Sequence, residues 1–171
     1  MKSFVPKVSF NQKDQPLKII PLGGVGDVTK NMYVYEMGDD ILIIDCGVGF
    51  PDEAMPGVDL VIPDITYLRD RINKIRGIVI THGHEDHIGG LPYIWPQLQV
   101  PIYTQRLTAG FIRAKFSEHN LPKNKIIELN LDQSLDLGKF KVSFYQVSHS
   151  VPDSTGVVIR RKFTSLTISF S

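Results

Sequence analysis

Hydrophobic and polar positions follow two different periods along this chain of 171 residues. Short apolar runs rich in β-branched residues and bounded by Gly, Pro, Asn or Asp are typical of strands, whereas apolar residues spaced three and four apart indicate amphipathic helices. The pattern predicts strands at about 17–22, 31–37, 40–45, 77–81, 101–104, 126–130, 140–148 and 156–160. It predicts helices at about 67–74, 91–98 and 107–118.

The order of these elements indicates the fold class. The early strands pair through a Gly38-Asp39-Asp40 turn, and the later strands alternate with helices. This order predicts an α/β fold in which helices cover one side of a mixed β-sheet. Residues 46–66 form a long loop rich in Pro, Gly and Asp, and a structureless loop of that length is usually functional.

Composition and charge narrow the class of protein and the cellular compartment in which it is expected. The chain is 42% hydrophobic and 22% charged, which is ordinary for a soluble globular domain, and its net charge of +1 gives no general attraction to nucleic acid. Its single Cys46 forms no internal disulfide, which fits a reducing compartment. No segment approaches the roughly 20 apolar residues of a membrane span, and the first residues lack the apolar core of a secretory signal. We therefore expect a cytoplasmic protein that does not enter a membrane.

The strongest chemical signal is the sequence His-Gly-His-Glu-Asp-His at residues 82–87, which follows a predicted buried strand. Imidazole is the commonest metal ligand, and histidine together with carboxylate suits zinc. His82 and His84 are two residues apart in an extended segment, so both can face one ion. Asp86 and His87 point differently and suit a second ion about 3.5–4 Å from the first. The alternative is a polar loop that is rich in histidine without binding metal.

These residues form the signature His-x-His-x-Asp-His-x-Gly-Gly, which resembles the metallo-β-lactamase superfamily. The longer string from Thr81 to Tyr93 resembles its RNA-processing branch, the ribonuclease J family. Other segments are similar to further motifs of that family: Leu42–Gly47, Phe50–Asp64, Ser148–Ser154 and the glycine loop Pro21–Asn31. In the glycine loop the family pattern has Glu-Ile-Gly where this chain has Asp27-Val28-Thr29. The resemblance covers about residues 17–160.

The resemblance implies a set of site residues. The implied metal ligands are His82, His84, Asp86, His87 and His149. Asp45 would orient those ligands without touching the metal. The implied cofactor is zinc, as one or two ions, with manganese or magnesium as alternatives. Some family members hold calcium near the acidic loop, which makes Gly57 and Asp59 candidates for a calcium site. A solvated loop is the alternative.

After Ile159 the chain departs from the family pattern. A Thr-Gly-Asp-Phe motif, whose Asp would bridge two metals, is not found, and residues 161–171 contain no His, Asp, Glu or Cys. We therefore expect a polar extension at 1–16, the N-terminal part of a metallo-β-lactamase αββα sandwich at 17–160, and a non-family tail at 161–171. A truncation is one explanation and a genuine short form is the other.

The departure has consequences for both fold and site. The second layer of sheet and helices is expected to be missing, which would leave an apolar sheet face uncovered and promote association between copies. The second metal site would retain only Asp86 and His87 and bind weakly.

The resemblance predicts a metal-dependent hydrolase that cleaves RNA phosphodiester bonds, as an endonuclease, a 5′-to-3′ exonuclease or both, using a metal-bound hydroxide. RNA would then be its partner. Two alternatives remain open. In the first alternative the chain is an inactive metal-binding fragment. In the second it is another hydrolase of the same fold, acting on a thioester or lactam, and Leu91-Pro92-Tyr93 disfavours this second alternative.

Overall fold

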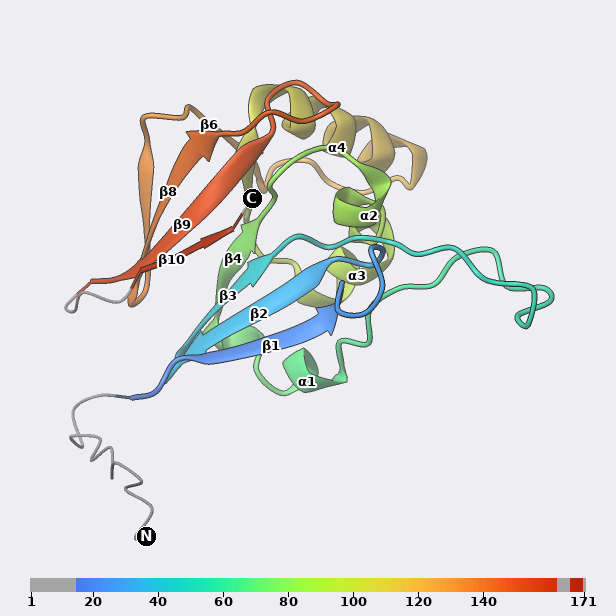
Figure 1. Cartoon of the computed structure of the whole chain (residues 1–171), viewed down its shortest axis with the longest axis horizontal. Coiled ribbons are helices and arrows are strands. Elements are labelled where there is room, and N and C mark those ends of the chain that lie inside the picture. Colours follow the sequence, from blue (N-terminus) through green and yellow to red (C-terminus); the bar gives the residue numbers. More distant parts are fainter. Residues whose placement is uncertain (1–14, 163–166, 171) are drawn as a thin grey trace, which may run out of the picture.

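Two β-sheets packed face to face form the centre of the molecule, and helices cover the outer face of the larger sheet (Figure 1). The computed structural model describes residues 15–162 and the backbone of residues 167–170. The predicted extension at 1–16 therefore lies almost wholly outside the described residues, and the predicted tail at 161–171 lies partly outside them. The division of the chain at these boundaries stays a prediction.

The larger sheet has six strands in the order β1-β2-β3-β4-β5-β6. They are β1 (Lys18–Gly23), β2 (Met32–Met37), β3 (Asp40–Ile44), β4 (Ile75–Val79), β5 (Ile102–Gln105) and β6 (Ile126–Leu129). The first three strands are antiparallel, and β3 to β6 are parallel. The predicted α/β fold with a mixed sheet is confirmed, and every strand of this sheet lies in a region where the sequence predicts one.

The second sheet has four antiparallel strands in the order β10-β9-β8-β7. They are β7 (Ser134–Leu137), β8 (Phe140–Gln146), β9 (Thr155–Arg161) and β10 (Thr167–Phe170). The expectation that a second layer of sheet would be missing is therefore wrong. The sequence pattern did not predict β7 and β10, which lie at the two edges of this sheet and pair with the longer strands β8 and β9.

The helices are α1 (Thr66–Arg69), α2 (Glu85–Ile88), α3 (Leu91–Leu98) and α4 (Arg106–Glu118), with a 3₁₀ turn at Ile72–Lys74. The predicted helix at 67–74 is thus a short helix followed by a tighter turn. Helix α2 lies inside the histidine motif and was not predicted. Its first turn contains Glu85 and Asp86, whose negative charges are favourable near a helix N-terminus. None of the helices in the described ranges has the length and apolar character of a membrane-spanning helix.

The larger sheet separates two hydrophobic cores, because successive side chains of a strand point to opposite faces. Val34 and Ile43 belong to the core beneath the helices. Their neighbours Tyr35 and Leu42 belong to the core between the two sheets, with Phe140. All of these side chains are buried. The continuous apolar run of β3 is therefore explained by burial on both faces.

The predicted uncovered apolar sheet face is not seen in the described part of the chain. The inner faces of the two sheets cover each other. On β8 the positions that point away from this core are Lys141, Ser143 and Tyr145, of which only Tyr145 is a large hydrophobic residue with substantial exposure. The second sheet thus supplies the cover that was expected to be missing, and the association of copies stays a prediction.

Replacing a core aromatic of α4 should test the packing of the helix layer. Phe116 is fully buried, and its ring centroid lies 5.1 Å from that of Trp95. Phe116→Ala should lower the free energy of unfolding by about 3–5 kcal/mol, because it leaves a cavity. Phe50→Ala is the matched control, since Phe50 is 65% exposed, and it should change stability by less than about 0.5 kcal/mol. Urea denaturation followed by circular dichroism measures both, and equal effects would contradict this packing.

Candidate metal centre

The candidate centre lies where two neighbouring parallel strands end. Strand β3 pairs with β4, with Ile44 opposite Val79. Asp45 directly follows β3, and the histidine motif follows β4. The carboxyl ends of parallel strands meet at one edge of a sheet, which is where α/β folds commonly place their sites. The local sequence thus fixes the motif at the sheet edge, and strand pairing brings Asp45 to it.

Three histidines from two distant segments converge at this edge. One ligand nitrogen each from His82, His84 and His149 lie within 4.8 Å of one another. His82 Nε2 and His84 Nδ1 are 3.0 Å apart, and the His149 ring centroid is 4.4 Å from that of His82. Two nitrogens on a tetrahedral zinc ion, each about 2.0–2.1 Å from the metal, lie roughly 3.3 Å apart. The spacing and the all-imidazole donor set therefore fit one divalent cation.

The buried carboxylate of Asp45 organises the motif. Asp45 Oδ1 accepts a hydrogen bond from the backbone N–H of Thr81 at 2.8 Å, and both carboxylate oxygens lie within 3.1 Å of Thr81 Oγ1. Asp45 Oδ2 is 2.8 Å from His87 Nδ1. Asp45 itself has a left-handed backbone, with φ of 61°, which Asp tolerates better than most residues. One carboxylate thus holds two parts of the motif.

These contacts determine which histidine nitrogens carry protons. An ionised carboxylate only accepts hydrogen bonds, so the single hydroxyl proton of Thr81 is donated to Asp45. Thr81 Oγ1 then accepts from His82 Nδ1–H, 3.0 Å away, which leaves the lone pair on His82 Nε2. By the same reasoning His87 Nδ1–H donates to Asp45 and leaves its lone pair on Nε2. His82 Nε2 is therefore in the form that binds a metal ion, and His87 Nε2 is in that form when His87 is neutral.

The pKa values of two motif histidines are shifted in opposite directions. Burial, reinforced by the neighbouring His87, lowers the pKa of His82 to about 4, so its ring is neutral at neutral pH. For His87, burial alone would lower the pKa, but the hydrogen bond to Asp45 and the charge of Asp45 outweigh burial and raise the pKa. A neutral His82 is the form that a metal ligand requires.

His149 is held less firmly than the other two histidines. Its side chain is exposed, and its Nδ1 accepts a hydrogen bond from the backbone N–H of Ser150 at 2.8 Å. A cation bound at Nδ1 would displace that contact. A cation bound at Nε2 requires a proton on Nδ1, which also ends it. Either way, binding a cation through His149 requires the ring to give up its contact with Ser150.

Asp86 and His87 form a second group beside the three histidines. Asp86 Oδ2 lies 3.3 Å from His87 Nε2. The side-chain amide of Asn31 contacts both residues, because its Nδ2 donates to Asp86 Oδ2 at 3.1 Å and lies 3.3 Å from His87 Nε2. Backbone bonds fix Asn31, because its N–H donates to the Asp86 carbonyl at 2.9 Å and its carbonyl accepts from Gly47. The sequence analysis missed Asn31, and its place at the end of the glycine loop was the one available signal.

The glycine loop is closed by hydrogen bonds to Asp27, at the positions where the sequence departs from the family pattern. Asp27 Oδ1 accepts hydrogen bonds from the backbone N–H and the hydroxyl of Thr29, at 2.9 and 2.8 Å. Hydrogen bonds from Lys30 and Thr29 lower the pKa of Asp27 to about 2. This turn lies at the positions where the family pattern has Glu-Ile-Gly, and Asn31, two residues after Thr29, contacts Asp86.

Backbone segments approach each other closely at two glycines. A Cβ at Gly47 would collide with the carbonyl oxygen of Asp86, and a Cβ at Gly90 would meet the carbonyl oxygen of Gly47. The backbone of the segment after β3 therefore packs directly on α2. Gly57 and Asp59 lie apart from this centre on the exposed loop, and the calcium site at these residues stays a prediction.

Comparison with known proteins fits this geometry. The sequence model of the metallo-beta-lactamase superfamily matches residues 25–169. The chain belongs to the metallo-beta-lactamase superfamily. This membership and the histidine cluster together point to a metal-binding site, without identifying the metal.

Curated relatives of this superfamily member include ribonucleases. It is 45% identical over 152 residues to ribonuclease J of Thermus thermophilus, an alignment that covers 84% of this chain and 26% of that protein. It is 38% identical to ribonuclease J 2 of Staphylococcus aureus, with 92% of this chain and 28% of that protein covered. The chain thus spans about a quarter of the length of these relatives.

Solved structures show the same metallo-beta-lactamase fold. The metallo-beta-lactamase fold protein YhfI of Bacillus subtilis aligns over 91% of this chain and 61% of the YhfI chain, with a TM-score of 0.61 and 19% identity. The short form of human tRNase Z aligns over 88% of this chain and 66% of its own, with a TM-score of 0.60 and 19% identity. At this identity the likeness concerns the fold alone.

Removing the charge of Asp45 should weaken metal binding, although Asp45 is not one of the expected ligands. In Asp45→Asn the side chain keeps its size, and Asn tolerates the left-handed backbone as Asp does. An amide cannot, however, accept all the hydrogen bonds that the carboxylate accepts. We expect zinc affinity to fall about 10–100-fold, the usual effect of losing a group that orients ligands. Titration against a chromophoric chelator measures it. Asp132→Asn, at an exposed turn, is the control and should leave affinity unchanged.

Proposed function

We propose that this chain forms the metal-binding part of a hydrolase that cleaves RNA phosphodiester bonds, in the manner that the names of its ribonuclease J relatives indicate. The observation that carries the proposal is the convergence of His82, His84 and His149 around one point, with Asp45 holding the motif in place. This arrangement occurs in a chain that is 45% identical to a ribonuclease J over most of its own length.

Zinc is the proposed cofactor at the three histidines, with manganese or magnesium as alternatives. Three imidazoles with one position left open is the ligand pattern of catalytic zinc, whereas magnesium prefers oxygen ligands. When bound, a divalent cation supplies Lewis-acid chemistry and lowers the pKa of a coordinated water to about 7. Asp86 and His87 are proposed to hold a second cation beside the amide of Asn31, which contacts both residues.

The residues of the chain prepare this chemistry in two ways. Asp45 and Thr81 fix the ring orientation and proton position of His82, so that no proton has to be lost before a cation binds. Burial keeps His82 neutral, and the surrounding pocket is lined by Asn31, Tyr33, Ile44, Asp45, Thr81, His82, His87, Val147, His149 and Thr155. The proposed setting is the cytoplasm, where buried Cys46 remains a free thiol.

Loss of a proposed ligand should abolish RNA cleavage. With zinc or manganese added, the chain should cleave a labelled single-stranded RNA, and His82→Ala should slow cleavage by more than about 100-fold, since even losing an orienting partner costs 10–100-fold. His119→Ala is the matched control because His119 lies outside the histidine cluster. Its activity should be unchanged, and a strong chelator should stop cleavage by the unmodified chain.

Products and metal content separate the competing functions. Labels at the two RNA ends distinguish internal cleavage from 5′-to-3′ degradation. Binding of zinc at one equivalent without any RNA cleavage would contradict the hydrolase and support a metal-binding fragment. Hydrolysis of a thioester or a lactam in place of RNA would contradict RNA as the substrate while leaving the metal centre intact.

A further inference from the structure

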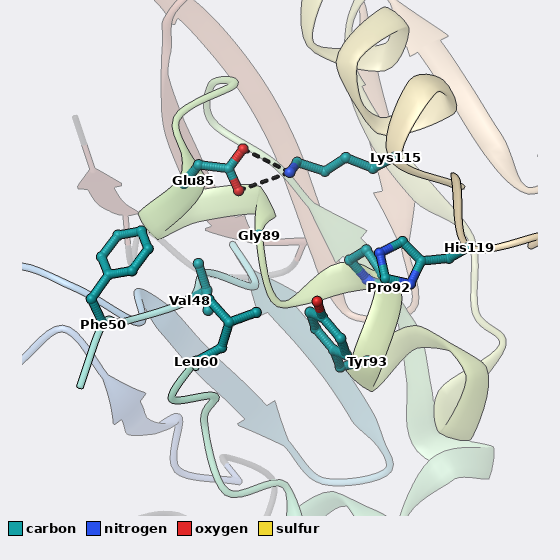
Figure 2. A pocket seen from close by; sticks show the side chains of 9 residues that line it. All are labelled: Val48, Phe50, Leu60, Glu85, Gly89, Pro92, Tyr93, Lys115 and His119. Carbon is teal, nitrogen blue, oxygen red and sulfur yellow. Dashed lines mark hydrogen bonds and ion pairs between the residues drawn. The ribbon is translucent and has the colours of Figure 1, made fainter. Parts of the chain in front are cut away.

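Helix α4 contacts both chain segments that carry the clustered histidines. On the side of the motif, the ring of Phe111 occupies the space that a Cβ at Gly83 would need. One turn further along, Lys115 Nζ forms an ion pair with both carboxylate oxygens of Glu85, at 2.6 and 2.8 Å (Figure 2). Gly83 and Glu85 flank His84, so two successive turns of α4 hold the middle of the motif.

The N-terminus of the same helix contacts the segment that carries His149. Asp153 Oδ2 accepts a hydrogen bond from the backbone N–H of Leu107 at 3.1 Å. The first amide groups of a helix have no partner within the helix, and Gln105, at the N-cap position, makes no side-chain capping bond. Asp153 therefore supplies from a distant segment the cap that α4 lacks locally, and its negative charge is favourable at this end of the helix.

The backbone around Asp153 is held in an uncommon conformation. Asp153 has φ of 62°, in the left-handed region that few residues other than Gly adopt. Two residues later, the N–H and hydroxyl of Thr155 both donate to the Thr81 carbonyl, at 3.1 and 3.0 Å. The segment is thus fixed to α4 at Asp153 and to the histidine motif at Thr155.

His149 itself has little else to hold it. Its side chain is exposed, and the hydrogen bonds and ring contacts described for it involve only Ser150, His82 and His84. Since cation binding also requires it to release Ser150, the position of the ring depends on where the segment is anchored. Two side chains anchor the segment, the hydroxyl of Thr155 on the motif and the carboxylate of Asp153 on α4.

We propose that Asp153 is a positioning residue for the metal centre, which by capping α4 holds His149 at the distance where the three imidazoles share one cation. Helix α4 then acts as a common frame, because the same helix fixes the motif through Phe111 and Lys115. The inference rests on the metal centre of the proposed function and not on RNA as the substrate.

Two substitutions separate the cap from the backbone conformation. In Asp153→Gly the glycine adopts the left-handed backbone without strain, and the cap is removed. This variant should lower zinc affinity about tenfold, which is the lower end of the effect of losing an orienting group. Asp153→Asn also tolerates that backbone and keeps an acceptor oxygen, so its affinity should stay within about threefold of the unmodified chain. Asn120→Gly is the matched control, since Asn120 is an exposed residue with φ of 54° at the other end of α4.

A double-mutant cycle distinguishes positioning of His149 from general loosening of the fold. In a His149→Ala background, Asp153→Gly should not weaken metal binding further. At saturating cobalt, Asp153→Gly should reduce the visible absorption of the tetrahedral ion, as His149→Ala does, while thermal unfolding confirms that each variant is folded.

Zinc affinity of Asp153→Gly equal to that of the unmodified chain, with an unchanged cobalt spectrum, would overturn the inference. An equal loss of affinity in the presence and absence of His149 would overturn it as well. Failure of the proposed function appears separately, as tight zinc binding by the unmodified chain without RNA cleavage.

Discussion

The structure of the candidate centre depends on one buried carboxylate. Asp45 accepts hydrogen bonds from the backbone and hydroxyl of Thr81 and from His87, and so joins the ends of strands β3 and β4. Because the carboxylate can only accept, it sets the direction of every hydrogen bond that reaches it. The proton on His82 is fixed through Thr81 in this way, although Asp45 does not contact His82. The left-handed backbone of Asp45 is a local strain that these hydrogen bonds compensate.

The layers of the fold bring the remaining groups to that carboxylate. The larger sheet supplies Asp45 and the histidine motif, and the second sheet supplies His149 from the loop between β8 and β9. Thr155, the first residue of β9, bonds to the carbonyl of Thr81 and so ties the second sheet to the motif. Helix α4 packs against the larger sheet through Phe116 and contacts both segments near the histidines. Strands and a helix that are far apart in the sequence thus hold the loops that carry the histidines.

The same scaffold occurs in proteins that differ widely in sequence. Solved structures with 19% identity share the fold at TM-scores near 0.6, among them a tRNase and a protein named only by its fold. A fold of this kind supports many reactions, so the chemistry has to be argued from the residues of the site. In this chain those residues are three histidines within reach of one ion and, beside them, Asp86 and His87, both of which contact the side-chain amide of Asn31.

The sequence by itself determined the strands of the larger sheet, the two longer helices and the identity of the histidine motif. Each of these is visible in a short window, because strand and helix periods and the spacing of His82, His84, Asp86 and His87 are local properties. Only the tertiary structure decided what supports them. Asp45 and Thr81 are 36 residues apart, Leu107 and Asp153 are 46 apart, and Asn31 and Asp86 are 55 apart. The short strands β7 and β10 likewise exist through pairing with β8 and β9. A partner far away along the chain leaves no periodic signal, and only folding brings it within hydrogen-bonding distance.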